Sequence, residues 1–133
     1  GGNFYILGDN VKNCLDACYD AVKVMKRVAN VIMPFPKGVV RSGSKVGSKY
    51  KDLVASTNHI YCPTIKGVIK DSAVPDNVHT CYEIVVDGAD ESAVSEAMKV
   101  GMHAAAKDGV VQITAGNFGG KLGKYKFFLK DLI

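Results

Sequence analysis

The chain of 133 residues is long enough to form one domain with its own hydrophobic core, without help from disulfides or metals. Apolar residues make up 47% of it and charged residues 23%, which excludes a disordered or collagen-like protein. No apolar run approaches the roughly 20 residues of a membrane span, and a net charge of +4 tolerates an anionic ligand without indicating nucleic acid.

Strand and helix patterns follow one another at the start of the chain. Asn3–Leu7 predicts a strand, and Gly8–Asn10 then breaks it and offers a helix N-cap. Apolar residues recur at helical spacing between Val11 and Ala29, which predicts a helix with one buried stripe. Val31–Met33 predicts a second strand, which Pro34–Gly38 ends because proline cannot donate to a central ladder.

The same order of elements returns in the second half of the chain. Cys81–Val86 predicts a buried strand, and Asp90 after it predicts the N-cap of a second helix. Val110–Thr114 predicts the returning strand, and Gly123–Lys130 alternates roughly, which predicts an extra edge strand with a lysine rim. The apolar stripe of the second helix consists of Val94, Ala97, Met98, Gly101 and Ala105.

Two strand–helix–strand units in one small domain predict an α+β fold, the ferredoxin-like split βαβ sandwich, with both helices on one face of the sheet. We therefore expect residues 1–133 to form a single ferredoxin-like lobe with a long middle loop. The first residue is glycine rather than methionine, so we also expect the chain to be part of a longer protein.

The cysteines and histidines do not have the spacing of a metal site. The four cysteines contain no C-x-x-C pair, and Cys14 and Cys18 lie on the apolar stripe of the first helix, as core residues do. His59, His79 and His103 share no ligand spacing. We expect no metal ion, and reduced thiols in the core, as in a cytoplasmic protein.

The middle segment, Gly38–Pro75, is too long for an ordinary connection and is rich in Ser, Gly, Lys and Asn. Its backbone amides and lysines suit a carboxylate or phosphate ligand, and a solvated loop is the competing interpretation. The candidate substrate-binding residues of this segment are Ser42, Ser44, Lys45, Ser48, Lys49, Asn58 and Tyr61.

Two further positions offer groups for chemistry. Glu83 lies inside the predicted buried strand, where a carboxylate is costly unless it is paired or neutralised. It is either a general acid or base that, when protonated, donates to a developing oxyanion, or an outward-facing residue paired with a lysine. Asn117 lies in the glycine-rich stretch Ala115–Gly120, which either lets the backbone approach a ligand or forms a plain tight turn.

Motifs along the whole chain resemble those of one enzyme family. They are Gly1-Gly-Asn-Phe-Tyr-Ile6, Ser42-Gly-Ser-Lys-Val-Gly-Ser-Lys49, Ala55-Ser-Thr-Asn58 with Tyr61-Cys-Pro-Thr64, Tyr82-Glu-Ile-Val85 and Ala115-Gly-Asn-Phe-Gly-Gly-Lys-Leu-Gly123. Long and in order, they resemble the C-terminal, distal lobe of formylmethanofuran:tetrahydromethanopterin formyltransferases. The resemblance implies two ferredoxin-like lobes in a full-length chain, with the N-terminal lobe absent from this one.

The resemblance also implies an activity: transfer of a formyl group from formylmethanofuran to N5 of tetrahydromethanopterin, in methanogenesis or formaldehyde oxidation. It gives the catalytic role to Glu83, through a tetrahedral intermediate, and substrate binding to the residues singled out above, Asn117 included. It implies a cytoplasmic homotetramer without nucleic-acid or membrane partners. It further implies that no metal or prosthetic group is bound and that the two carriers of the formyl group are substrates.

Two alternatives stay open. A subunit of a bacterial formyltransferase/hydrolase complex would use the same site with water as the final acceptor. A non-enzymatic ferredoxin-like binding module would bind its partner through a basic strand with aromatic residues. Tyr125, Phe127 and Phe128 in the lysine-rich tail weakly resemble such an RNA-binding strand.

Overall fold

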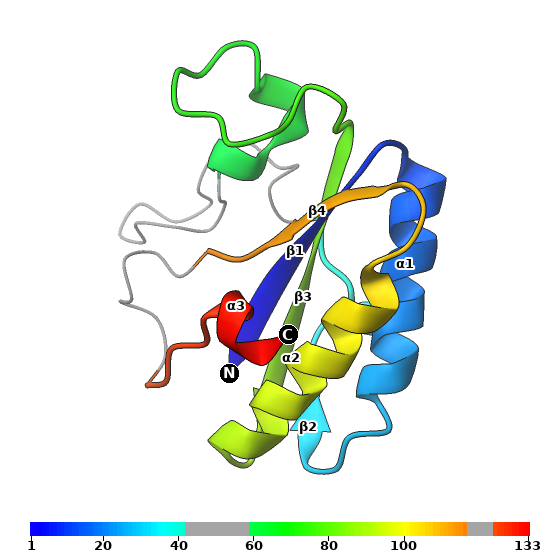
Figure 1. Cartoon of the computed structure of the whole chain (residues 1–133), viewed down its shortest axis with the longest axis vertical. Helices are drawn as coiled ribbons and strands as arrows, with labels where there is room; N and C mark the ends of the chain where they lie inside the picture. Colours follow the sequence, from blue (N-terminus) through cyan, green and yellow to red (C-terminus); the bar gives the residue numbers. More distant parts are fainter. Residues whose placement is uncertain (42–58, 117–123) are drawn as a thin grey trace.

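The structure, a computed structural model, describes residues 1–41, 59–116 and 124–133 (Figure 1). Two strand–helix–strand units form most of it. The first contains β1 (Gly2–Gly8), α1 (Val11–Met25) and β2 (Val31–Ile32). The second contains β3 (Thr80–Gly88), α2 (Glu91–Ala105) and β4 (Val110–Thr114), and a short helix α3 (Leu129–Leu132) follows. Short 3-10 turns lie at Pro36–Gly38, His59–Tyr61 and Pro63–Ile65.

The described strands form one antiparallel sheet in the order β2-β3-β1-β4, with β1 and β3 as the central pair. Since β3 lies between β1 and β2, and β1 between β3 and β4, each helical connection passes over one intervening strand. This is the split βαβ arrangement of ferredoxin-like folds. Figure 1 shows α1 and α2 side by side on the same face of the sheet. The predicted fold class is confirmed.

Both long helices begin at the predicted caps. Asn10 Oδ1 accepts a hydrogen bond from the backbone N–H of Asn13 at 2.9 Å, and Asp90 Oδ1 accepts one from Ala93 at 2.8 Å. Each cap satisfies an N–H group that the first turn of a helix leaves unpaired. The helices of the described residues are each too short or too polar to cross a lipid bilayer.

The first helix is shorter than its apolar pattern predicted. It ends at Met25, whereas the pattern runs to Ala29. The chain then tightens into 3-10 bonding, as in the bond from Arg27 N–H to Val24 O at 3.1 Å, and Asn30 takes the left-handed conformation with a φ of 64°. This tighter turn reverses the chain before β2.

The main core lies between the sheet and the two helices. The predicted stripe of α2 is buried in it, as are Cys14 and Cys18 of α1, and all four cysteines are buried thiols outside any disulfide. A hydrogen bond with Cys14, together with burial, raises the pKa of Cys18, and burial raises the pKa of Cys81. These two thiols are therefore protonated packing groups, as predicted for core cysteines.

The opposite face of the sheet is covered in part by residues 59–79. The Lys66 ammonium ties this segment together, donating to the carbonyl oxygens of Asp76 at 2.9 Å and Val78 at 2.8 Å. Because the segment covers the end of β1 at Leu7, the other end of this face, at Asn3, is left partly accessible. The buried cluster under the segment consists of Tyr5, Leu7, Val74, Val78 and Cys81.

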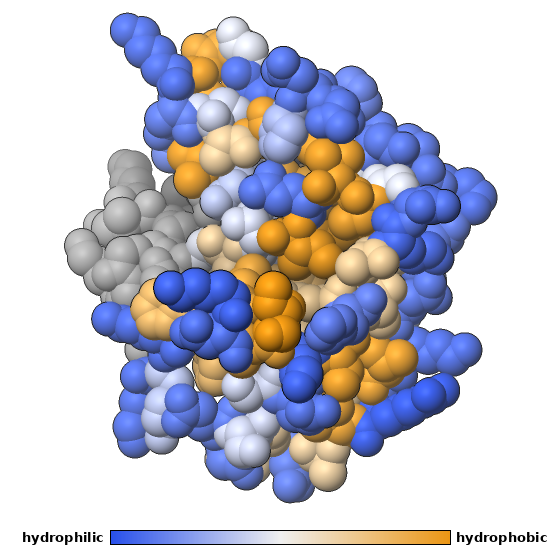
Figure 2. Space-filling view, in the orientation of Figure 1, coloured by the Kyte–Doolittle hydropathy of each residue, from blue (hydrophilic) through white to orange (hydrophobic). Residues whose placement is uncertain are grey.

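The C-terminal segment does not form the predicted edge strand. Residues 124–128 are irregular, and Leu129–Leu132 forms α3. Leu129 and Leu132 lie three residues apart, which is a helical spacing, and both pack with Phe127 against the main core. Figure 2 shows apolar surface gathered over α3, β4 and α2 on this side of the molecule, within a hydrophilic rim.

Candidate functional site

Glu83 lies in the middle of β3, on the face of the sheet that points away from the helices. Successive strand residues alternate between faces, and its neighbours Tyr82 and Ile84 belong to the main core. Tyr5 of β1 is its partner on one side, and on the other side Glu83 exchanges two backbone hydrogen bonds of 2.9 Å with Val40. The backbone of Glu83 is therefore held from both sides.

The side chain of Glu83 is half-buried and bonded to the neighbouring strand. Asn3 Nδ2 donates to Glu83 Oε1 at 2.8 Å. Asn3 pairs with Val85 in the β1–β3 register, so Asn3 and Glu83 are diagonal neighbours on the same face, within reach of long side chains. Among the described residues, the partner of Glu83 is thus an uncharged amide rather than the lysine of the outward-facing interpretation.

A cavity of about 690 Å³ lies beside Glu83 and Asn3. Strand β4 ends at Thr114, opposite Tyr5, and within the described chain no strand pairs with β1 beyond that point on this side. The cavity opens there, between the part of β1 that β4 does not cover and the residues after β4. Its size is that of a small-molecule site.

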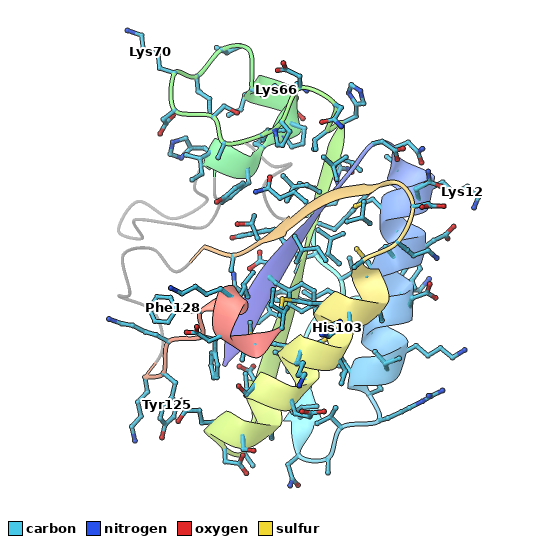
Figure 3. The ribbon with its side chains drawn as sticks, viewed as in Figure 1. Lys12, Lys66, Lys70, His103, Tyr125 and Phe128 are labelled. Carbon is cyan, nitrogen blue, oxygen red and sulfur yellow. The ribbon has the colours of Figure 1, made fainter. Side chains whose placement is uncertain are left out.

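The cavity walls are mainly apolar, with a few polar groups. Phe127 and Phe128 of the C-terminal segment supply part of the apolar wall, and Asp87 adds a second carboxyl group on the same strand as Glu83. Figure 3 shows Tyr125 and Phe128 on this segment, next to α3. An apolar hollow with a small number of converging polar side chains is typical of a binding or catalytic site.

Tyr61 lies near this site without lining the cavity. Its ring stacks on the ring of Tyr5, and its hydroxyl lies 3.5 Å from Thr114 Oγ1. Since Tyr5 is the cross-strand partner of Glu83, Tyr61 is one residue removed from the candidate catalytic group. The structure therefore places Tyr61 against the cross-strand partner of Glu83, and its role in substrate binding stays a prediction.

The remaining predicted binding residues fall outside the described residues. Their substrate contacts stay predictions. These residues are Ser42, Ser44, Lys45, Ser48, Lys49, Asn58 and Asn117.

Sequence reasoning missed the cross-strand partners of Glu83. The alternation of β1 places Asn3 and Tyr5 on one face, but only the antiparallel register with β3 shows that they adjoin Glu83. Asp87 was missed as a cavity residue for the same reason, and the aromatic residues of the tail were missed because the path of residues 124–129 depends on tertiary packing. Across 1–41, 59–116 and 124–133, no three His, Cys, Asp or Glu side chains gather as metal ligands would.

Comparison with known proteins decides the family. A family model described as "FTR, proximal lobe" matches residues 1–132. The chain belongs to the FTR family. The predicted family is confirmed, and the matching model describes this lobe as proximal, which corrects the term distal.

Relatives in this family are identical to the chain at about half of the positions in the matched region. The formylmethanofuran–tetrahydromethanopterin formyltransferase of Methanocaldococcus jannaschii is 56% identical over 136 residues, which cover 99% of this chain and 45% of that protein. The structure of the Methanosarcina barkeri formyltransferase superimposes with a TM-score of 0.89 at 47% identity, and the match covers 100% of this chain and 46% of that one.

A bacterial structure matches almost as well. It is the formyltransferase/hydrolase complex of Methylorubrum extorquens with methylofuran, in which the matched chain has a TM-score of 0.87 at 45% identity. The match covers 99% of this chain and 44% of that one. The chain thus spans less than half the length of the FTR relatives that it matches here.

Proposed function

We propose that the chain carries the catalytic carboxyl group of an N-formyltransferase, which moves a formyl group from formylmethanofuran to N5 of tetrahydromethanopterin. The observation that carries the proposal is Glu83, anchored by Asn3 at the wall of a cavity of about 690 Å³, in a chain of the FTR family. Because the chain spans less than half the length of its relatives, we assign the activity to the full-length protein.

The chemistry is acyl transfer between two nitrogen atoms. N5 attacks the formyl carbon, a tetrahedral intermediate forms, and the bond to the donor nitrogen breaks as the proton from N5 passes to that nitrogen. Glu83 in its protonated form donates to the developing oxyanion or carries this proton. One such oxyanion donor contributes roughly 3–4 kcal/mol to transition-state stabilisation in comparable acyl transfers.

The binding residues proposed from the sequence complete this picture. Lys45 and Lys49 suit anionic groups on the carriers, and Tyr61 and Asn117 offer hydrogen bonds beside the Glu83 strand. We further propose a homotetramer in the cytoplasm that holds no metal or prosthetic group. These proposals are supported by the resemblance between the quoted motifs and those of the family.

Formyl hydrolysis is the second candidate function. The relative from Methylorubrum extorquens belongs to a formyltransferase/hydrolase complex, so a subunit role in such a complex is favoured by a specific comparison. Water would then be the final acceptor and formate the product. The binding module is weakened, since Tyr125, Phe127 and Phe128 lie in an irregular segment and a cavity wall rather than in a strand.

Product analysis tests the proposal. The full-length gene product is incubated with formylmethanofuran, with and without tetrahydromethanopterin, and N5-formyl product and formate are both quantified. Transferase function predicts N5-formyl product that depends on the acceptor, with little formate in its absence. Formate without acceptor would favour the hydrolase complex, and neither product from a folded protein would contradict the proposal.

A further inference from the structure

We propose that Asn3 is a positioning residue for Glu83: its amide binds one carboxyl oxygen and leaves the other to face the reacting groups. This inference rests on the proposed function, since it assigns Asn3 a part in the same formyl transfer. It starts from the bond between Asn3 Nδ2 and Glu83 Oε1, at 2.8 Å, between side chains from two different strands.

The two strands that carry the pair are the best-anchored part of the sheet. β1 and β3 are its central strands, and their register runs without a break from Gly2 opposite Val86 to Gly8 opposite Thr80. Groups held on strands keep their geometry better than groups on loops. A bond between two such strands therefore fixes the carboxyl group relative to the cavity that both residues line.

The direction of the hydrogen bond favours one carboxyl oxygen for the reaction. An amide N–H can only donate, so Oε1 of Glu83 accepts. In a protonated carboxyl group the carbonyl oxygen is the stronger acceptor, so this bond favours placing the O–H on Oε2, away from Asn3. In the transfer, Oε2 gives its proton to the leaving nitrogen and receives one from N5, so that Glu83 ends in its starting state and Oε1 stays bound to Asn3.

Asn3 also has the burial expected of a residue that serves a site rather than the core. It is half-buried, and among the described residues Glu83 is the hydrogen-bonding partner of its side chain. It points to the face away from the main core, since Phe4 next to it is fully buried among core residues. Replacing it should therefore change the orientation of Glu83 more than it changes the fold.

Two substitutions separate the hydrogen bond from the space that Asn3 fills. Asn3→Asp keeps the size and shape but has no N–H, and Asn3→Leu keeps the branched shape without any polar group. Gln112→Leu is the matched control, because Gln112 pairs with Leu7 on the same face of the sheet and does not line the cavity. Circular dichroism and thermal unfolding check that each variant folds.

The assay measures kcat and KM for N5-formyl product, with full-length protein. We expect both Asn3 variants to lose about tenfold or more in kcat with KM changed less than about threefold, because a positioning residue acts on the chemical step. Gln112→Leu should stay within about twofold of wild type. In a Glu83→Gln background, adding Asn3→Leu should lower kcat by a further factor of less than about three, since the two residues act as a unit.

Each contrary result has a distinct meaning. An inactive, folded wild type would overturn the proposed function and this inference with it. An active wild type that loses activity in Glu83→Gln but not in either Asn3 variant would overturn the positioning role alone. A rise in KM without a fall in kcat, or an equal loss from Asn3→Leu in both backgrounds, would also overturn it, because Asn3 would then act independently of Glu83.

Discussion

The ring of Tyr61 stacks on the ring of Tyr5, with centroids 5.3 Å apart and planes inclined by 29°. Tyr5 is fully buried in β1, directly opposite Glu83, whereas Tyr61 is half-buried in a 3-10 turn far along the chain. The stack therefore connects the segment that covers one end of the sheet to the strand pair that carries the candidate catalytic group.

Removing the Tyr61 ring should loosen this connection. We expect Tyr61→Ala to lower the free energy of unfolding by about 2 kcal/mol, from lost burial and lost stacking. Tyr61→Phe keeps the ring and loses only the long contact to Thr114, so it should change that free energy by less than about 0.5 kcal/mol. Urea unfolding measures both, and equal losses in the two variants would contradict the stacking account.

Lys66 should stabilise the segment that carries Tyr61. Its ammonium group donates to the exposed Asp76 O and the part-buried Val78 O, so Lys66→Met removes a charged donor from both carbonyl oxygens, at a cost of about 1–3 kcal/mol. Lys70→Met is the control, because Lys70 is exposed on the same segment, away from these carbonyls (Figure 3). Amide hydrogen exchange should become faster across residues 59–79 in Lys66→Met but not in Lys70→Met. Equal exchange rates in the two variants would contradict this role of Lys66.

The cap of α2 offers a test of the fold. Asp90→Ala removes the acceptor of the Ala93 N–H, which should cost about 1 kcal/mol of stability. Glu91→Gln next to it removes a first-turn charge without removing the cap and should cost less. Thermal unfolding compares the two, and a larger loss in Glu91→Gln would show that charge rather than capping stabilises this end.

Alkaline pH should weaken the fold through Cys81. Burial raises the pKa of this thiol above its ordinary value of 9.0, so above about pH 9 the unfolded chain loses a proton that the folded chain keeps. Stability is then full below that pH and falls as pH rises, by at most about 1.4 kcal/mol per unit for one thiol. Urea unfolding of Cys81→Ala should show a shallower fall than wild type, and equal slopes would contradict the assignment.

The element pattern was predictable because it depends on local spacing. The caps Asn10 and Asp90 and the strand Val110–Thr114 follow from side-chain chemistry and periodicity within a few residues. The structure of the C-terminal segment was not predictable in this way. Leu129 and Leu132 lie in a short helix that packs against the core, and local alternation does not reveal that packing. The end of α1 at Met25 was also not predicted, because the 3-10 bonds after it and the left-handed Asn30 leave no trace in the apolar spacing.

The site was predictable only where one residue stood out by itself. A carboxyl group in an apolar strand identified Glu83 as a candidate without knowledge of the sheet. Asn3 is 80 positions away in the chain and adjoins Glu83 only through the register of β1 and β3. The cavity depends on where β4 ends and on the path of residues 124–129, neither of which a single sequence pattern specifies.

The central claim is that the carboxyl group of Glu83 takes part in formyl transfer. The most direct measurement compares kcat for N5-formyl product in the full-length protein as wild type, Glu83→Gln and Glu96→Gln, the last an exposed glutamate of α2. We predict a loss of about a hundredfold or more in Glu83→Gln and none in Glu96→Gln. Wild-type kcat in a folded Glu83→Gln variant would contradict the account and leave Glu83 as an ordinary strand residue.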